Sequence, residues 1–198
     1  LPLENGDTIY LTVADKDGNM VSLIQSNYGD MGAGLTPTNL GFSFQNRGQL
    51  FSLKDDHPNV YAPNKRPFHT IIPAFVTKDD KPWLSFGLMG GSMQPQGHAQ
   101  IIINIVDFGM NTQEAGDAAR IRHTGSSQPT DQIIKDGGTL YLESSINNEI
   151  RNQLKEMGHN VSQNINVYGG YQAIMYDEKN EIYYGASDPR KDGQAIGY

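Results

Sequence analysis

Residues 8–19 read TIYLTVADKDGN and determine how the first part of the chain folds. The run 9–14 is rich in β-branched and aromatic side chains, which favour a strand. The run 15–19, DKDGN, consists of turn-forming residues, and a second β-rich run, 20–26, follows it directly. The stretch therefore predicts a β-hairpin near the start of the chain.

The same reasoning extends to the rest of the sequence. Further strands are predicted where short β-rich runs are bounded by turn signals, at 42–46, 70–77, 83–88, 171–176 and 181–184. Apolar residues at helical spacing predict a buried helix over 99–110, preceded by Gly90-Gly91. Strands, then helices, then strands again indicate an α+β domain with antiparallel sheets.

Two shorter helices are expected from their capping residues. One begins at Asn111 or Thr112 and ends near Ala119. The other runs from about 145 to 157, is opened by Ser144 or Ser145 and closed by Gly158, and is predicted to turn an apolar face inward.

Composition excludes several classes of protein. The 198 residues suit one domain and carry a formal net charge of −7, with Lys and Arg scattered, so nucleic acid is not an expected partner. No apolar run in this chain has the length of a membrane-spanning helix. The absence of cysteine excludes thiol catalysis and zinc–thiolate sites. No metal or other cofactor is predicted, since the Asp55-Asp56-His57 run has no matched ligands elsewhere, and the compartment stays open.

Several blocks resemble, in order, the small subunit of γ-glutamyltranspeptidases. They are TIYLTVADKDGN at 8–19, PNKRP at 63–67, GGS at 90–92, DFGMN at 107–111 and GASDPR at 185–190. The resemblance implies the four-layer αββα sandwich of N-terminal-nucleophile hydrolases, with this chain supplying the central strands and one helical layer. It also implies that residues 1–7 end a pro-segment, that residues 8–198 form the nucleophile-bearing domain, and that a large N-terminal subunit of the same precursor completes the protein.

The resemblance implies that Thr8 is the catalytic nucleophile. A threonine hydroxyl needs a base at neutral pH, and a free α-amino group with a pKa of roughly 7.7–8.0 can act as that base from the same residue. The Asp7–Thr8 bond must then be cut, which the family does by self-cleavage. The chain on its own is expected to be inactive.

Other site residues also come from the resemblance. Gly90 and Gly91 match the family's oxyanion loop, where the lack of a Cβ lets backbone N–H groups approach a substrate. Ser26 matches a hydroxyl beside the nucleophile. His69 and Thr70 match a Ser-Ser pair that helps to bind the glutamyl α-carboxylate.

The sequence departs from the family pattern around the substrate. Arg47 and Leu50 stand where transpeptidases have a Gln and an Asp that hold the substrate's α-amino group, and Tyr28 stands at a substrate-contacting Asn. Arg47 would favour a carboxylate or an acyl oxygen instead. The small-molecule substrate is thus a γ-glutamyl compound or a related acyl amide.

Three functions stay open at this stage. They are a self-processing hydrolase or transpeptidase, an acylase for non-glutamyl amides, and an uncleaved pseudoenzyme or binding subunit. Interior surfaces left uncovered without the large subunit predict self-association, including a homo-oligomer. Two structural expectations complete the prediction: Gln94, Gln96 and His98 form a polar cluster at a helix end, and Arg190 fastens the C-terminal region to the sheet.

Overall fold

The computed structural model describes residues 6–163 and 168–198 of the chain. Its first feature is the predicted hairpin, in which β1 (Gly6–Ala14) pairs antiparallel with β2 (Met20–Gly29). The Asp15 carboxylate accepts hydrogen bonds from the backbone N–H groups of Asp17 and Asn19, and Gly18 has a φ of 85°. The turn residues therefore close the hairpin as the sequence predicts.

A four-stranded antiparallel sheet forms the centre of the molecule. Its strands are β3 (Ala74–Lys78), β4 (Lys81–Met89), β8 (Gly170–Asp177) and β9 (Ile182–Ser187), in the order β3-β4-β8-β9. The two middle strands, β4 and β8, are separated in the sequence by both helices of the core and by residues 121–163. The sheet thus joins two segments that lie far apart in the sequence.

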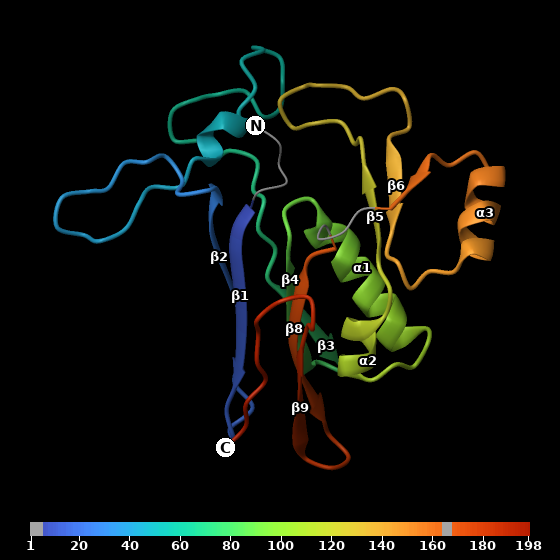
Figure 1. Cartoon of the computed structure of the whole chain (residues 1–198). Coiled ribbons are helices and arrows are strands. Elements are labelled where there is room, and N and C mark those ends of the chain that lie inside the picture. The colour runs from blue at the N-terminus through green and yellow to red at the C-terminus, as the bar shows by residue number, and fades with distance from the viewer. Residues whose placement is uncertain (1–5, 164–167) are drawn as a thin grey trace.

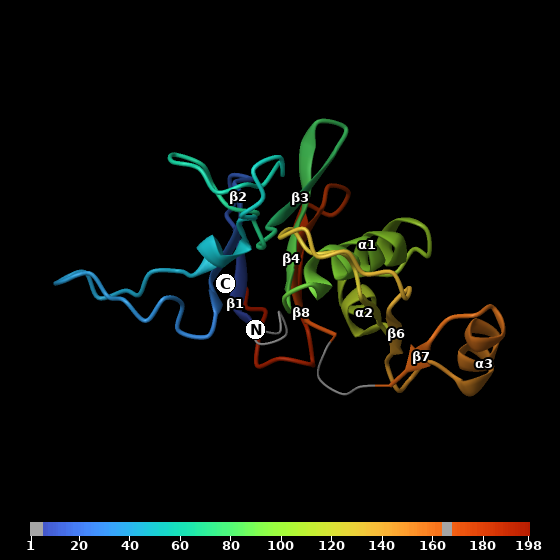
Figure 2. The same cartoon turned by 90° about the horizontal axis from the view of Figure 1, so that it is seen from above.

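The two faces of this sheet are covered differently. The β1–β2 ribbon lies against one face, whereas α1 (Met93–Val106) and α2 (Thr112–Asp117) cover the other (Figures 1 and 2). The core between sheet and helices is built from Leu84, Phe86, Leu88, Met93, Ile101, Ile105, Ala115, Tyr171, Ala173 and Ala186. The chain therefore contributes two β layers and one helical layer, as the sequence led us to expect.

A smaller unit lies beyond the helical layer. It consists of β5 (Ile121–Thr124), β6 (Thr139–Leu142), β7 (Val161–Ser162) and α3 (Asn148–Glu156), and Figure 1 shows it on the far side of α1 from the central sheet. None of these three strands was predicted. A single 3₁₀ turn, η1 (Arg47–Leu50), follows the long loop after β2.

Two predicted strands need correction. Residues 42–46 form a loop, because Phe44 makes its backbone hydrogen bonds with Ala33 and Leu35 of the same loop and not with a sheet. The predicted strand 70–77 begins only at Ala74. Upstream of Ala74, the Gln94 side chain bonds the N–H of Ile72 and the carbonyl of Thr70.

The prediction for α3 was partly wrong. Its N-cap is Asn147, whose side chain accepts a hydrogen bond from the Ile150 N–H, and not Ser144 or Ser145. The apolar face does not turn inward, since Ile150 is 45% and Met157 73% exposed. The helix sits at the edge of the small sheet, where no layer formed by residues 6–163 and 168–198 covers that face. By contrast, α2 begins at Thr112 with Asn111 as its N-cap, as predicted, and it ends at Asp117, slightly before the predicted end near Ala119. Asn111 and Glu114 also form a capping box, which the sequence analysis did not predict.

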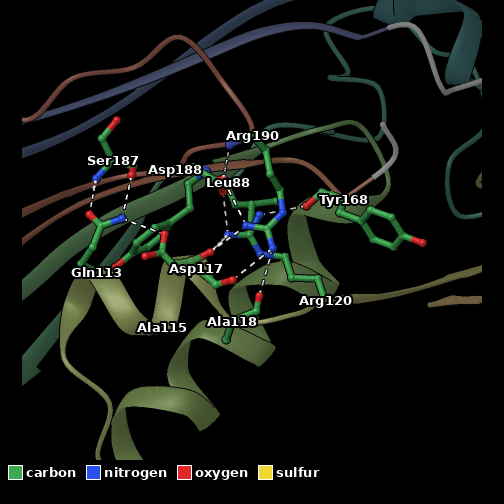
Figure 3. A network of polar contacts seen from close by, with 12 residues as sticks. Leu88, Gln113, Ala115, Asp117, Ala118, Arg120, Tyr168, Ser187, Asp188 and Arg190 are labelled. Atoms are coloured by element: carbon green, nitrogen blue, oxygen red, sulfur yellow. Dashed lines mark hydrogen bonds and ion pairs between the residues drawn. The ribbon is translucent and has the colours of Figure 1, made fainter. Parts of the chain in front are cut away.

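A buried ionic network joins α2, β5 and the end of β9 (Figure 3). Arg120 Nη2 and Asp188 Oδ2 are 2.6 Å apart, with side chains that are 1% and 0% exposed. Arg190 contacts the other Asp188 oxygen and makes a two-bond fork to Glu143, with both distances 2.6 Å. Arg190 thereby fastens the C-terminal region, as predicted, but to Glu143 and to the carbonyls at the end of α2, and not to the sheet.

The network also explains the charge state of its acid. Burial alone would raise the pKa of Glu143, but hydrogen bonds from Arg190 and from the Arg120 N–H lower it below its ordinary value. Glu143 therefore stays ionised beside the two guanidinium groups.

Candidate active site

A pocket of about 650 Å³ opens where the ends of β1 and β2 meet the start of α1. The loop segment 68–72, the end of β5 and the loop that follows it up to residue 129 complete its wall. Most of the residues singled out from the sequence line it together: Thr8, Ser26, Tyr28, Leu50, His69, Thr70 and Gly91. Gly90 is directly adjacent in the chain, and Arg47 lies behind Ser26 and Thr70.

Thr8 reaches the pocket because of its position in β1. Residues alternate along a strand, so Thr8 shares a face with Tyr10, which is buried, and Thr12, whose hydroxyl lies 2.6 Å from Ser85 Oγ. This face points toward the central sheet. Thr8 is half-buried and pairs with Ser26 in the ladder.

The ladder is irregular next to Thr8. Gly6 pairs with Gly29 and Thr8 pairs with Ser26, so extra β2 residues oppose a single β1 position. Irregularities of this kind are frequent beside active sites, where they redirect a side chain or end the pairing. The Asp7–Thr8 peptide bond lies at this break in the ladder.

The Gly90-Gly91 turn connects β4 to α1 on the opposite side of the pocket. Gly90 has a φ of 129° and Gly91 a φ of 58°. A Cβ on Gly90 would come within 2.8 Å of the Gly169 α-carbon, so close chain packing requires glycine there. The Gly91 N–H has no acceptor among the described residues, which leaves it available at the positive end of α1.

Tyr28 and Arg47 form the wall behind Ser26. Tyr28 has a φ of 81°, an uncommon conformation for an aromatic residue, and its N–H donates to Ser26 Oγ over 2.9 Å. The Arg47 guanidinium lies 5.7 Å from the centre of the Tyr28 ring. Burial raises the pKa of Tyr28, which is partly offset by Gln49 and by the Arg47 charge.

Comparison with known proteins identifies the family. Residues 2–198 match the family model described as gamma-glutamyltranspeptidase. The chain belongs to the γ-glutamyltranspeptidase family.

Individual members of the family are similar over nearly the whole chain. The glutathione hydrolase-like YwrD proenzyme of Bacillus subtilis is 38% identical over 96% of this chain and 36% of its own length. The cephalosporin acylase of Bacillus halodurans superposes with a TM-score of 0.83 at 40% identity, covering 96% of this chain and 34% of that one.

A second structure matches over its full length. The γ-glutamyltranspeptidase from Pseudomonas nitroreducens complexed with L-DON gives a TM-score of 0.78 at 27% identity, covering 96% of this chain and 98% of that chain. These likenesses confirm the predicted α+β fold of N-terminal-nucleophile hydrolases. The chain spans about a third of the length of the curated relatives it matches.

Some pocket residues of this family member were not assigned from the sequence. Gln94 is 1% exposed and holds the 70–72 segment through two hydrogen bonds of 3.0 and 3.1 Å. Arg122, from the unpredicted β5, donates to Ser92 Oγ over 3.1 Å. The sequence Ile121-Arg122-His123-Thr124 gives only a weak signal for a strand. Arg122 and His123 interrupt its β-rich composition, which is why β5 was not predicted.

The polar cluster expected at the start of α1 is only partly present. The side chains of Gln94 and Gln96 form hydrogen bonds with the backbone of neighbouring segments. The Gln96 amide nitrogen donates to the His123 carbonyl, and the Gln96 amide oxygen accepts from the His123 N–H. His98 instead turns to the sheet, where its Nε2 accepts a hydrogen bond from the Leu88 N–H over 3.2 Å. Burial lowers the pKa of His98 to about 4, so the ring is neutral at pH 7.

Two searches of the described residues bear on other site types. Within 6–163 and 168–198, no helix combines the length and apolarity that crossing a bilayer requires. The same residues contain no group of three or more His, Asp or Glu side chains arranged to hold a metal ion.

Proposed function

We propose that Thr8 is the nucleophile of a self-processing hydrolase or acyltransferase that cleaves γ-glutamyl or related acyl-amide bonds. The observation that carries this proposal is that Thr8 and Gly91, from separate elements, line one pocket. Acyl transfer needs a nucleophile and an oxyanion donor on two sides of a reacting carbonyl, and this arrangement supplies both.

Self-cleavage would come first. The Thr8 hydroxyl attacks the carbonyl of residue 7, and the peptide bond rearranges to an ester that water opens. The break in the β1–β2 ladder supports this step, because the bond to be cut is not held in regular pairing. The products are a free α-carboxylate at the end of the chain that ends with Asp7 and a free α-amino group on Thr8.

The new amino group then acts as the base of the second reaction. It takes the proton of the Thr8 hydroxyl, which attacks the substrate amide, and passes a proton to the leaving amine. The negative charge on the carbonyl oxygen is held by the N–H groups of Gly90 and Gly91 beside the start of α1. Water or an amine resolves the acyl-enzyme. Ser26, paired with Thr8, positions the nucleophile.

A large N-terminal subunit is part of this proposal. The similar curated proteins are proenzymes about three times as long as this chain, and the outer face of the β1–β2 ribbon has apolar side chains without cover. We expect the rest of the precursor to cover that face as the fourth layer. Residues 1–7 are then the end of the pro-segment, although residues 1–5 lie outside the described part of the chain.

The test is self-cleavage of the full-length precursor at neutral pH. Intact mass and N-terminal sequencing are expected to give a new chain beginning Thr-Ile-Tyr. Thr8→Ala should abolish it, whereas Thr8→Ser should retain slower cleavage because a hydroxyl remains. An intact chain under all conditions would instead support an uncleaved pseudoenzyme or binding subunit.

The second candidate function is an acylase that acts on non-glutamyl amides. One observation favours it over an enzyme specific for γ-glutamyl groups. No Asp or Glu is among the described residues that line the pocket, so no side-chain carboxylate is there to hold a substrate's ammonium group. The cephalosporin acylase that superposes on this chain makes a non-glutamyl amide a concrete alternative.

A further inference from the structure

Helix α1 and strand β5 lie side by side, and two glutamines of the helix join them (Figure 1). The Gln96 amide nitrogen donates to the His123 carbonyl over 3.0 Å, and its amide oxygen accepts from the His123 N–H over 2.7 Å. One turn further along the helix, Gln100 makes the same pair of bonds with Ile121, at 3.0 and 2.9 Å. The two side chains therefore bond the edge of β5 as a neighbouring strand would.

Each of these glutamines also bonds its own helix. The amide nitrogen of Gln100 donates a second hydrogen bond to the backbone carbonyl of Gln96 over 3.0 Å, in the middle of α1. The amide nitrogen of Gln96 donates its second bond to the Ser92 carbonyl over 3.1 Å, where the helix begins. The two residues thus share one bonding pattern but hold different parts: Gln100 holds the body of the helix, and Gln96 holds its entry.

Ser92 directly follows the Gly90-Gly91 turn. Its carbonyl accepts from Gln96, and its hydroxyl accepts from Arg122 Nη2 of β5 over 3.1 Å. Both glycines have a positive φ, and glycine is the residue with the most conformations open to it. The turn is therefore fastened to β5 through two groups of Ser92, and these contacts help to select one conformation of the two glycines.

Gln96 lines the pocket, but its hydrogen-bond donors are already in use. The side-chain amide has two N–H hydrogens, and these go to the carbonyls of Ser92 and His123. The amide oxygen accepts from the His123 N–H. A substrate gains no donor from Gln96 unless one of these bonds breaks. The residue is therefore suited to holding parts of the pocket in place and not to binding a ligand.

The position of the Gly90-Gly91 turn matters because stabilisation of an oxyanion depends on distance. A donor is effective at about 2.7–3.1 Å from the developing oxyanion, and a displacement of about 1 Å can cost on the order of 10²-fold in rate. Under the proposed function, the N–H groups of this turn are the donors. A contact that fixes the turn therefore acts directly on the rate of the chemical step.

Resting on the proposed function, we infer that Gln96 is a positioning residue for the Gly90-Gly91 turn. It acts through Ser92 and β5, and it holds the N–H groups of the turn at the distance from Thr8 that the transition state requires. The reacting carbonyl oxygen becomes negative in both acylation and deacylation, so both steps depend on Gln96. Binding of the substrate before the reaction does not.

Gln96→Met and Gln100→Met form a matched pair for testing this inference in the full-length protein after self-cleavage. Each variant loses three hydrogen bonds, two of them to β5, and methionine keeps the length and the helix propensity of glutamine. The substrate is γ-glutamyl-p-nitroanilide, or butyryl-p-nitroanilide if the enzyme cleaves that compound faster. We expect Gln96→Met to lower kcat by about tenfold or more and to change KM by less than about threefold. Gln100→Met should keep both constants within about twofold of wild type.

Three results would overturn the inference. An unchanged kcat in Gln96→Met would show that the turn does not need the residue. An equal fall in kcat for both variants would show that contact between α1 and β5 matters only as a whole, and a higher KM with unchanged kcat would show that Gln96 binds the substrate. If Gln96→Met does not fold, Gln96→Glu is compared with Gln100→Glu in the same way, because the carboxylate keeps the acceptor and loses both donors.

Failure of the proposed function gives a different result. If the precursor never cleaves at Asp7–Thr8, the proposed hydrolase is wrong, and amide hydrogen exchange in the intact protein tests the turn alone. The N–H groups of Met93 and Gln94 close the turn by bonding to the two glycine carbonyls, both over 3.1 Å. Exchange of these two amides about tenfold faster in Gln96→Met than in Gln100→Met supports the positioning role. Equal exchange in the two variants overturns it.

Discussion

The ring of Tyr10 lies directly over the α-carbon of Gly87, which brings β1 against β4 at a point where β4 has no side chain. The Tyr10 hydroxyl is 2.7 Å from Ser22 Oγ, so a hydrogen bond to β2 also fixes the ring. Thr8 is two residues before Tyr10 on the same strand face. The depth at which Thr8 sits in the pocket therefore depends on the contact of Tyr10 with Gly87.

Gly87→Ala is expected to displace β1. The added Cβ would overlap the Tyr10 ring, and overpacking of this kind costs roughly 1–3 kcal/mol of unfolding free energy. Urea unfolding of the full-length protein measures the loss, and mass spectrometry measures the slower self-cleavage that we expect with it. Gly48→Ala, whose Cβ would meet nothing within 4 Å, is the control for stability. Cleavage of Gly87→Ala at the wild-type rate would show that this contact does not position Thr8.

Asp188→Asn should be among the most destabilising single changes. It keeps the shape of the side chain but leaves Arg120, which is 1% exposed, without its buried counter-charge. Breaking a buried pair in this way costs about 3–5 kcal/mol. Asp17→Asn, in an exposed ion pair, should change the unfolding free energy by less than about 0.5 kcal/mol. Similar denaturation midpoints for the two variants would contradict the role given to the network.

The lowered pKa of the buried His98 predicts that the free energy of unfolding decreases in mild acid. Its pKa is about 4 in the folded chain against an ordinary value of 6.5, so the unfolded state binds the proton first as pH falls. The contribution is fully present above pH 6.5 and is lost down to about pH 4, by about 2–3 kcal/mol at most because the ring is not fully enclosed. Denaturant unfolding at several pH values measures it. His98→Gln keeps an acceptor for the Leu88 N–H and should flatten the curve in this window; an unchanged slope would exclude His98 as its source.

The outer face of the ribbon should determine how the chain associates. Leu11 and Leu23 pair across the ladder and are 42% and 40% exposed, with Ile9, Val13 and Val21 beside them. An apolar patch of this kind favours contact with another surface. Leu11→Lys with Leu23→Lys is expected to make the isolated chain monomeric by sedimentation and to weaken retention of the large subunit in the cleaved protein. Thr77→Lys, on the exposed edge of β3, is the control, and equal association of both proteins would exclude the ribbon face.

The sequence predicted the elements whose signal is local. The hairpin at 8–26 and the helix start at Asn111 each depend on neighbouring residues, and they appear where expected. The long helix is present, but it spans Met93–Val106 and not 99–110, and Ile103 and Val106 of its predicted apolar face are exposed. The segment 42–46 has a strand's composition but pairs with no strand among the described residues, whereas β5, β6 and β7 acquire their strand character by pairing with one another. Pairing partners far apart in the chain are the information that composition lacks.

The candidate site was also predicted only in part, because some of its residues are brought to the pocket by packing between segments that are far apart in the sequence. Thr8 and Gly91 were assigned from family blocks and Ser26 from a matching family position, and all three line one pocket. Gln94 and the 122–129 wall were missed because their place in the pocket depends on how α1 and β5 pack. The roles of all these residues stay predictions until the variants are measured.

The break in pairing between Gly6 and Thr8 would also make maturation a one-way step. Downstream of a cut at Asp7–Thr8, every ladder pair from Thr8 to Ala14 is left in place, so the new terminus stays seated in the protein that made it. Upstream, only the Gly6–Gly29 pair holds the severed end among the described residues, and that end is free to diffuse out of the pocket. Religation would require the lost carboxylate to return to a site that substrate now occupies.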